Sequence, residues 1–158
     1  MNEIFGDLFA FYTRPGYKIC LTTNGFIKKD GTGVMGRGCA REAVDLEPDL
    51  PRLLGLSLKT RGNVVANLTS KFLSFPVKHN WFEEANLVLI KESAIELKRR
   101  ALELPDIKFI LPRPGCGNGR LKWEDVKPIL EEVEFPDNII IISFWEDRPN
   151  AARVASQT

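Results

Sequence analysis

Histidine and cysteine are scarce in this sequence, which has one histidine and three cysteines among 158 residues. The cysteines, Cys20, Cys39 and Cys116, are widely separated and form no C-x-x-C pair. With His79 as the only histidine they do not match the ligand spacing of a zinc site, and their odd number argues against a disulfide framework. We therefore expect no metal site, and we expect the thiols to be buried as small apolar side chains.

The sequence also lacks a long apolar run and an excess of charge of one sign. No stretch has the length of a membrane span, and the N-terminus lacks the basic start and apolar core of a signal peptide. The 22 Lys and Arg residues balance 21 Asp and Glu residues. A large basic face, which would drive tight nucleic-acid binding, is therefore not expected. These features predict a monomeric cytoplasmic protein without membrane association.

What the sequence does have is an alternation of strand-like and helix-like segments, with a hydrophobic content of 44% that suits a single core. Strands are predicted at four apolar, β-branched runs: Tyr17–Thr22, Asn63–Leu68, Ile107–Pro112 and Asn138–Phe144. The last run is apolar on both faces, as a strand covered on two sides requires. Such alternation predicts an α/β fold around a parallel or mixed sheet.

Helices are predicted between these runs. The clearest is Phe82–Leu104, whose early acidic and late basic residues suit the helix dipole. A second is Trp123–Glu134, in which we expect Pro128 near the first turn. A shorter helix should follow the first glycine-rich segment. We expect one domain over residues 1–149 and a flexible C-terminal tail over residues 150–158.

The first glycine-rich segment, DGTGVMGRGCAREA, has the G-x-G-x-x-G spacing of dinucleotide-binding folds. In those folds the first glycine directly follows the first strand, but here NGFIKKD intervenes. The stretch EPDLPRLLG, where a second strand would lie, is broken by two prolines. A Rossmann site is therefore excluded, whereas an anion-binding loop leading into a helix is not. A plain surface loop is the alternative.

A second glycine-rich loop, in LPRPGCGNGRLKWEDV, again follows a predicted strand and precedes a predicted helix. Ligands of open α/β sheets bind beyond the carboxyl ends of the strands, so the two loops should open on the same edge of the sheet. Two facing loops that can both bind anions predict a diphosphate held from both sides. Two unrelated flexible turns would be the alternative.

Three segments together resemble the macrodomain family: CLTTNG…GTGVMGRGCAREA, FPVKHNW and LPRPGCGNGRLKWEDVKPIL. The resemblance is closest to the branch of terminal ADP-ribose glycohydrolases and DNA ADP-ribosyl glycohydrolase antitoxins. It spans residues 6–144 and implies a three-layer α/β fold with a mixed central sheet sandwiched between helices. It also implies that the ligand is ADP-ribose, with no further cofactor, bound across the crest of the sheet.

The resemblance implies roles for individual residues. Asp7 would accept a hydrogen bond from adenine, and Asn24 would orient the distal ribose. Without the resemblance, Asp7 could equally be a turn or helix-cap aspartate, and Asn24 would be a plain turn residue. Phe144 would pack against adenine, where core packing is the alternative. The remaining residues implied to bind the diphosphate come from the two loops and are Gly33, Val34, Met35, Gly36, Gly38, Gly115, Cys116, Gly117, Asn118 and Gly119.

Lys78 matches the critical lysine of the glycohydrolase branch. The amine could attack the sugar if its pKa were lowered, or it could remain charged and stabilise the leaving group or a phosphate. An ordinary solvated lysine is the alternative. Protein-directed members of the branch carry an aspartate where this chain has Gly119. Asp30 or His79 would have to replace that acid.

The resemblance therefore implies an ADP-ribosyl glycohydrolase that removes ADP-ribose from DNA or protein without a metal, with Lys78 and Asn24 as its catalytic residues. A toxin partner is also implied. Two alternatives share the same site: a non-catalytic reader of ADP-ribose, and a phosphatase acting on ADP-ribose 1″-phosphate. Gly119 keeps the reader open, because it removes the acid that the catalytic members use.

Overall fold

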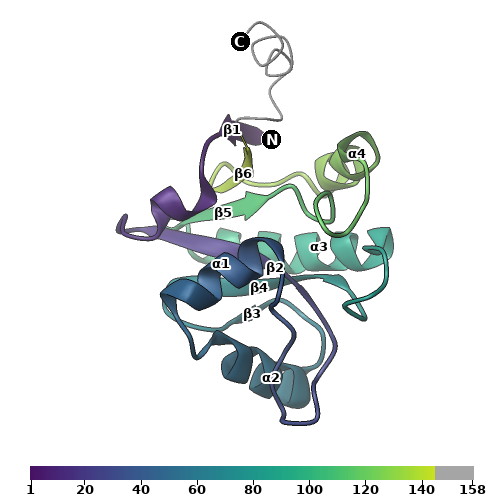
Figure 1. Ribbon diagram of the computed structural model, residues 1–158. Helices are drawn as coiled ribbons and strands as arrows, with labels where there is room; N and C mark the ends of the chain where they lie inside the picture. Colours follow the sequence, from purple (N-terminus) through teal and green to yellow (C-terminus); the bar gives the residue numbers. More distant parts are fainter. Residues whose placement is uncertain (145–158) are drawn as a thin grey trace, which may run out of the picture.

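A six-stranded sheet with helices on both faces makes up the computed structural model, which describes residues 1–144 (Figure 1). The strands are β1 (Asn2–Phe5), β2 (Tyr17–Asn24), β3 (Ala66–Asn67), β4 (Phe72–Lys78), β5 (Lys108–Pro112) and β6 (Ile139–Ser143). Their order across the sheet is β1-β6-β5-β2-β4-β3. All neighbours pair in parallel except β3, which runs antiparallel to β4 at one edge.

Helices cover each face of this sheet and bury a separate apolar cluster. The 3₁₀ helix η1 (Leu8–Phe11), α1 (Gly38–Leu46) and α2 (Leu50–Arg61) cover one face. Helices α3 (Leu87–Glu103) and α4 (Trp123–Val133) cover the other. The three layers and the mixed sheet confirm the predicted fold. Within residues 1–144, no helix is both long enough and apolar enough to cross a membrane.

Alternation along the strands explains why the core has two halves. In β2, Ile19 and Leu21 point toward α1 and α2, whereas Cys20 points toward α3 and α4. In β6, Ile141 belongs to one cluster and Ile142 to the other. The apolar run at the end of the chain is therefore a strand covered on both sides, as predicted.

The parallel pairing places the functional edge of the sheet. Strands β2, β4, β5 and β6 all run in one direction, so their carboxyl ends at Asn24, Lys78, Pro112 and Ser143 lie along the same edge. Both glycine-rich segments leave from this edge, one after β2 and one after β5. The predicted convergence of the two loops follows from this topology.

Several elements differ from the prediction. Strands β1 and β4 and helix α2 were not predicted, and the second run, Asn63–Leu68, forms only the two residues of β3. Pro51, which argued against a strand, lies in the first turn of α2, where proline is favoured. Helix α3 begins at Leu87 because the Asn86 side chain accepts a hydrogen bond from the Leu89 amide (3.0 Å). Pro128 lies inside α4, so its placement near the first turn was wrong.

The predicted C-terminal tail over residues 150–158 lies outside the described residues. The described part ends at Phe144, directly after β6. The expected single domain over residues 1–149 stays a prediction for the positions beyond Phe144.

The contact between α2 and the first loop yields a prediction for stability. A Cβ atom added at Gly55 of α2 would lie 1.9 Å from the carbonyl oxygen of Gly31. Gly55→Ala should therefore lower the free energy of unfolding by about 1–3 kcal/mol, the usual cost of overpacking. Urea unfolding would measure this loss. Leu56→Ala, at the exposed neighbouring position, is the control and should change stability by less. Equal stability of Gly55→Ala and the parent protein would contradict the packing described.

Candidate functional site

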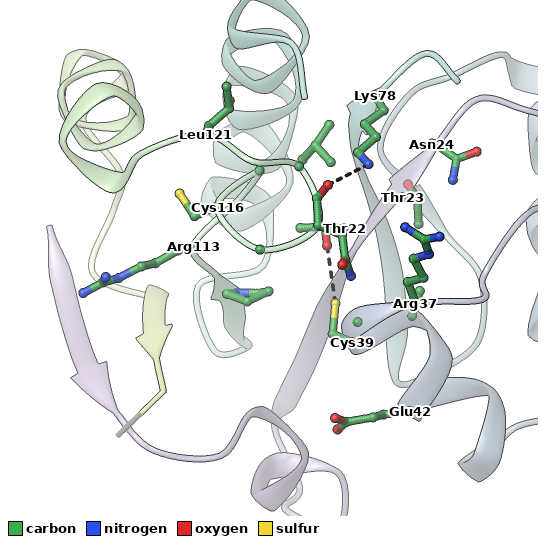
Figure 2. Close-up of a pocket in the computed structure, with 18 of the residues that line it drawn as sticks. Thr22, Thr23, Asn24, Arg37, Cys39, Glu42, Lys78, Arg113, Cys116 and Leu121 are labelled. Carbon is green, nitrogen blue, oxygen red and sulfur yellow. Dashed lines mark hydrogen bonds between the residues drawn. The ribbon is translucent and has the colours of Figure 1, made fainter. Parts of the chain in front are cut away.

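A cavity of about 750 Å³ lies at the sheet edge where the four parallel strands end (Figure 2). Strand ends, the start of α1 and the second glycine loop form its walls. Most of the residues singled out from the sequence line it: Asn24, Val34, Gly36, Gly38, Lys78, Gly115, Cys116, Gly117, Asn118, Gly119 and Phe144. Asp7, Gly33 and Met35 are not among the lining residues.

The first loop, residues 25–37, is held in place by Asn24. Its side-chain amide donates to the Val34 carbonyl (3.2 Å), and its side-chain oxygen accepts from the Phe26 amide (3.1 Å). Two of the expected phosphate-binding residues turn out to support this loop. The Gly33 amide donates to Pro51 (2.8 Å), and its Cα packs so closely on Leu54 that no side chain would fit. Met35 is buried in the core.

The loop ends at the first turn of α1, where Gly38, Cys39 and Ala40 line the cavity. The cap residue, Arg37, makes no side-chain hydrogen bond to this turn. The first amides of a helix lack partners within the helix and carry the positive end of its dipole. A side chain added at Gly36 would meet nothing within 4 Å. This wall therefore offers both space and amide donors to an anion.

The second loop is closed by its own backbone. The Leu121 amide donates to Gly115 (2.9 Å), and the Arg120 amide donates to Gly117 (3.0 Å). A Cβ atom added at Gly117 would meet no other atom within 4 Å, as at Gly36. The two loops also approach each other closely, because a Cβ atom on Gly38 would lie 3.0 Å from the side-chain nitrogen of Asn118.

Gly119 has no room for the carboxylate that related glycohydrolases carry. A Cβ atom there would lie 2.5 Å from the Gly115 carbonyl oxygen and 2.8 Å from the Ala85 side chain. The Gly119 carbonyl is itself bonded to the Ala85 amide (3.0 Å). Glycine at this position is thus a requirement of the loop, and an acid would need a different backbone.

Lys78, the last residue of β4, links the second loop to the strand ends. Its Nζ donates to the Asn118 carbonyl (3.0 Å, Figure 2) and to the Trp81 carbonyl (3.3 Å). Burial lowers the pKa of this amine, and the nearby charges of Arg120 and Arg37 lower it further. The lysine is therefore held in the cavity wall with a weakened preference for its charged form.

Charged residues that sequence reasoning did not single out also line the cavity. Arg37 and Arg113 are both present, and Arg113 donates to the Ser143 hydroxyl (2.7 Å) while its guanidinium lies 5.0 Å from the Trp123 ring centre. Glu42 is the one carboxylate among the described residues that line the cavity. Arg37 and Glu42 lie inside the first glycine-rich segment and Arg113 lies inside the second, so the segments held a signal for all three.

The proposed substitute acids are not in the cavity. Asp30 is exposed and accepts bonds from the Thr32 amide (3.0 Å) and hydroxyl (2.7 Å), which lower its pKa and favour the carboxylate. His79 is exposed and is absent from the cavity lining. Neither residue is therefore placed to donate a proton to a ligand there.

Phe144, the residue directly after β6, also lines the cavity. It is 51% exposed, so it is not packed into the core. Asp7 instead caps η1, where its side chain accepts from the Phe9 amide (3.0 Å). The cap role left open from the sequence is the one that the structure gives Asp7.

Comparison with known proteins identifies relatives. No family model matches the chain. A DNA ADP-ribosyl glycohydrolase of Mycobacterium tuberculosis (strain ATCC 25618 / H37Rv) is 30% identical over 118 residues. The match includes 66% of this chain but 33% of the relative, so the chain corresponds to about a third of that protein's length.

Solved structures share the fold. The macrodomain of Thermus aquaticus DarG has a TM-score of 0.69 at 24% identity, covering 90% of this chain and 96% of that one. Thermosipho africanus DarTG in complex with ADP-ribose also has a TM-score of 0.69, at 21% identity, covering 97% of this chain and 44% of that one. Together with the sheet order and the two glycine loops, these matches show that the chain is a macrodomain related to the DarG DNA ADP-ribosyl glycohydrolases.

Proposed function

We propose that this macrodomain binds ADP-ribose in the cavity and hydrolyses the bond that links it to a macromolecule, with ADP-ribosylated DNA as the preferred substrate. The observation that carries the proposal is the position of Lys78. It ends a central strand, lines the cavity and is bonded to the second glycine loop through Asn118. A reactive amine thus lies beside the surface best suited to a diphosphate.

The two loops supply the diphosphate site. On one side, the first turn of α1 offers amides and the positive end of the helix dipole. On the other, Gly117 leaves open space at the exposed tip of the second loop. Arg37 adds a positive charge at the cavity wall. A diphosphate placed between the loops would meet amide donors at the start of α1 and open space at the second loop.

Lys78 is assigned the role of nucleophile, because its lowered pKa increases the fraction of neutral amine. In the first step, the Nζ lone pair forms a bond to the anomeric carbon as the bond to the DNA breaks. The departing group keeps the bonding electron pair and takes up the proton that the amine loses. Water then forms a bond to the anomeric carbon as the carbon–Nζ bond breaks. The nitrogen keeps that electron pair and takes up a proton from the water, which releases ADP-ribose and restores the amine. In Figure 2, Glu42 lies on the other side of Cys39 from Lys78, so it is given no role in these steps.

The rim next to Lys78 suits a nucleic-acid strand. Trp81 and Phe82 are 45% and 59% exposed and form an edge-to-face pair with ring centres 5.5 Å apart. Exposed aromatic rings are the surfaces on which single-stranded bases stack. Arg37 and Arg120 form no salt bridge with the described residues, so they are available to phosphates. The expected monomeric state and toxin partner remain predictions.

Filling the loops should block binding. Gly36→Leu and Gly117→Leu place a side chain in open space, so the unfolding temperature should stay within a few degrees while ADP-ribose affinity falls at least about tenfold. Isothermal titration calorimetry measures the affinity. Gly6→Ala, which is outside the cavity lining and has only an ordinary contact with Ile142, is the control. Unchanged affinity in both leucine variants would contradict the diphosphate site.

Removing the amine should remove turnover. Lys78→Ala should lower the rate of ADP-ribose release from DNA by at least about 100-fold, and Lys78→Arg should not restore it, because guanidinium stays charged. The parent rate should rise with pH through a pKa below the usual value of 10.5 for lysine, since the neutral amine is the reactive form. Lys91→Ala, on the exposed face of α3, is the control.

Substrate choice is tested with ADP-ribosylated DNA, ADP-ribosylated protein and ADP-ribose 1″-phosphate. Release from DNA alone, or from DNA faster than from the other two, supports the proposal. Binding without release from any of them would establish a reader, and phosphate release would establish a phosphatase. Full activity of Lys78→Arg would replace the nucleophilic role with an electrostatic one.

A further inference from the structure

Thr23 has a buried hydroxyl group without a hydrogen-bond partner among the described residues. The residue is 4% exposed, and its Oγ1 is one of two buried side-chain oxygens for which the described structure gives no partner. Thr23 also lines the cavity. Its neighbour Thr22 differs, because its hydroxyl lies 3.4 Å from the sulfur of Cys39. Of these two neighbouring threonines in the cavity wall, Thr23 is thus the one whose hydroxyl has no partner among the described residues.

The pairing of β2 with β4 is irregular directly after Thr23. Strand β2 pairs regularly with β4 up to the pair of Thr23 with Pro76, and then shifts so that Asn24 lies opposite Lys78. Such an irregularity near a site re-aims the side chains next to it. Figure 2 shows Thr23 beside Asn24, on the side of the cavity where Lys78 lies. Thr23 therefore directly precedes the residue that lies opposite Lys78 in the sheet.

An unsatisfied buried hydroxyl is unfavourable for the folded protein. Leaving such a group without a partner has a cost comparable to a lost hydrogen bond, and valine would fill the same volume without that cost. Buried polar groups in folded proteins are almost always bonded to protein or to ordered water. A threonine in this position is explained if its partner arrives with the ligand.

We infer that the Thr23 hydroxyl binds the sugar of ADP-ribose that lies next to Lys78, by a hydrogen bond to one of its hydroxyl groups. This inference rests on the proposed function, since Lys78 marks which end of the ligand reacts. Thr23 is a ligand-binding residue that orients the sugar, with Asn24 holding the first loop beside it through Val34. It gives the cavity a means of recognising the second sugar in addition to the diphosphate.

The test compares Thr23→Val with the parent protein for two ligands, ADP-ribose and ADP, which lacks the second sugar. The dissociation constant for ADP-ribose should rise about three- to tenfold, the effect of losing one hydrogen bond, while that for ADP should change by less than twofold. The unfolding temperature should stay the same or rise. Thr23→Ser keeps the hydroxyl and should stay within about twofold of the parent protein. Thr60→Val, on α2 and outside the cavity lining, is the control.

Each other outcome overturns the inference in a distinguishable way. Parent-like ADP-ribose affinity of Thr23→Val means that no hydrogen bond reaches the sugar. Equal weakening for ADP and ADP-ribose means that the hydroxyl acts elsewhere in the site. A lower unfolding temperature means that Oγ1 has a partner within the protein. If the parent protein binds neither ligand, the proposed function fails first, independently of Thr23.

Discussion

The parallel pairing of β2, β4, β5 and β6 is the constraint on which the site depends, because it brings four strand ends to one edge of the sheet. Two glycine-rich loops leave from this edge. Lys78, at the end of β4, donates a hydrogen bond to the Asn118 carbonyl of the second loop. The two loops lie close together at Gly38, where an added Cβ atom would lie 3.0 Å from the side-chain nitrogen of Asn118, and Gly119 lets the second loop pack closely on Gly115 and Ala85. The sheet therefore sets the position of the loops, and these glycines allow their close packing.

The cavity collects positive charge and hydrogen-bond donors. Arg37, Arg113, Lys78 and the start of α1 line it, against the single described carboxylate of Glu42. Burial lowers the pKa of Lys78, and the positive charges of Arg120 and Arg37 lower it further. A diphosphate bound at these donors would place a sugar near the amine. Gly119 leaves no room for an acid in the second loop.

The glycine motifs and apolar runs were sufficient to predict an α/β fold, the two loops and their shared edge, because strand direction and glycine spacing are local properties of a sequence. They were insufficient for β4, because Pro76 argued against a strand in a segment that is mostly buried. They were also insufficient for α2, because the prolines near its start indicated only that no strand lies there. Gly33 and Met35 lie within the expected motif but support it, since which residue of a loop faces the cavity depends on packing against α2. Thr23 was missed for the same reason, because the burial of its unpartnered hydroxyl depends on neighbours that are distant in sequence.

The central claim is that backbone amides from two separate loops bind one diphosphate. Nuclear magnetic resonance of the ¹⁵N-labelled protein during titration with ADP-ribose tests it most directly, because it reports each amide separately. The account predicts that the largest chemical-shift changes occur together at Gly36–Ala40 and at Gly117–Asn118, with one shared dissociation constant. Changes confined to one loop, or centred away from the edge where β2 and β5 end, would contradict it.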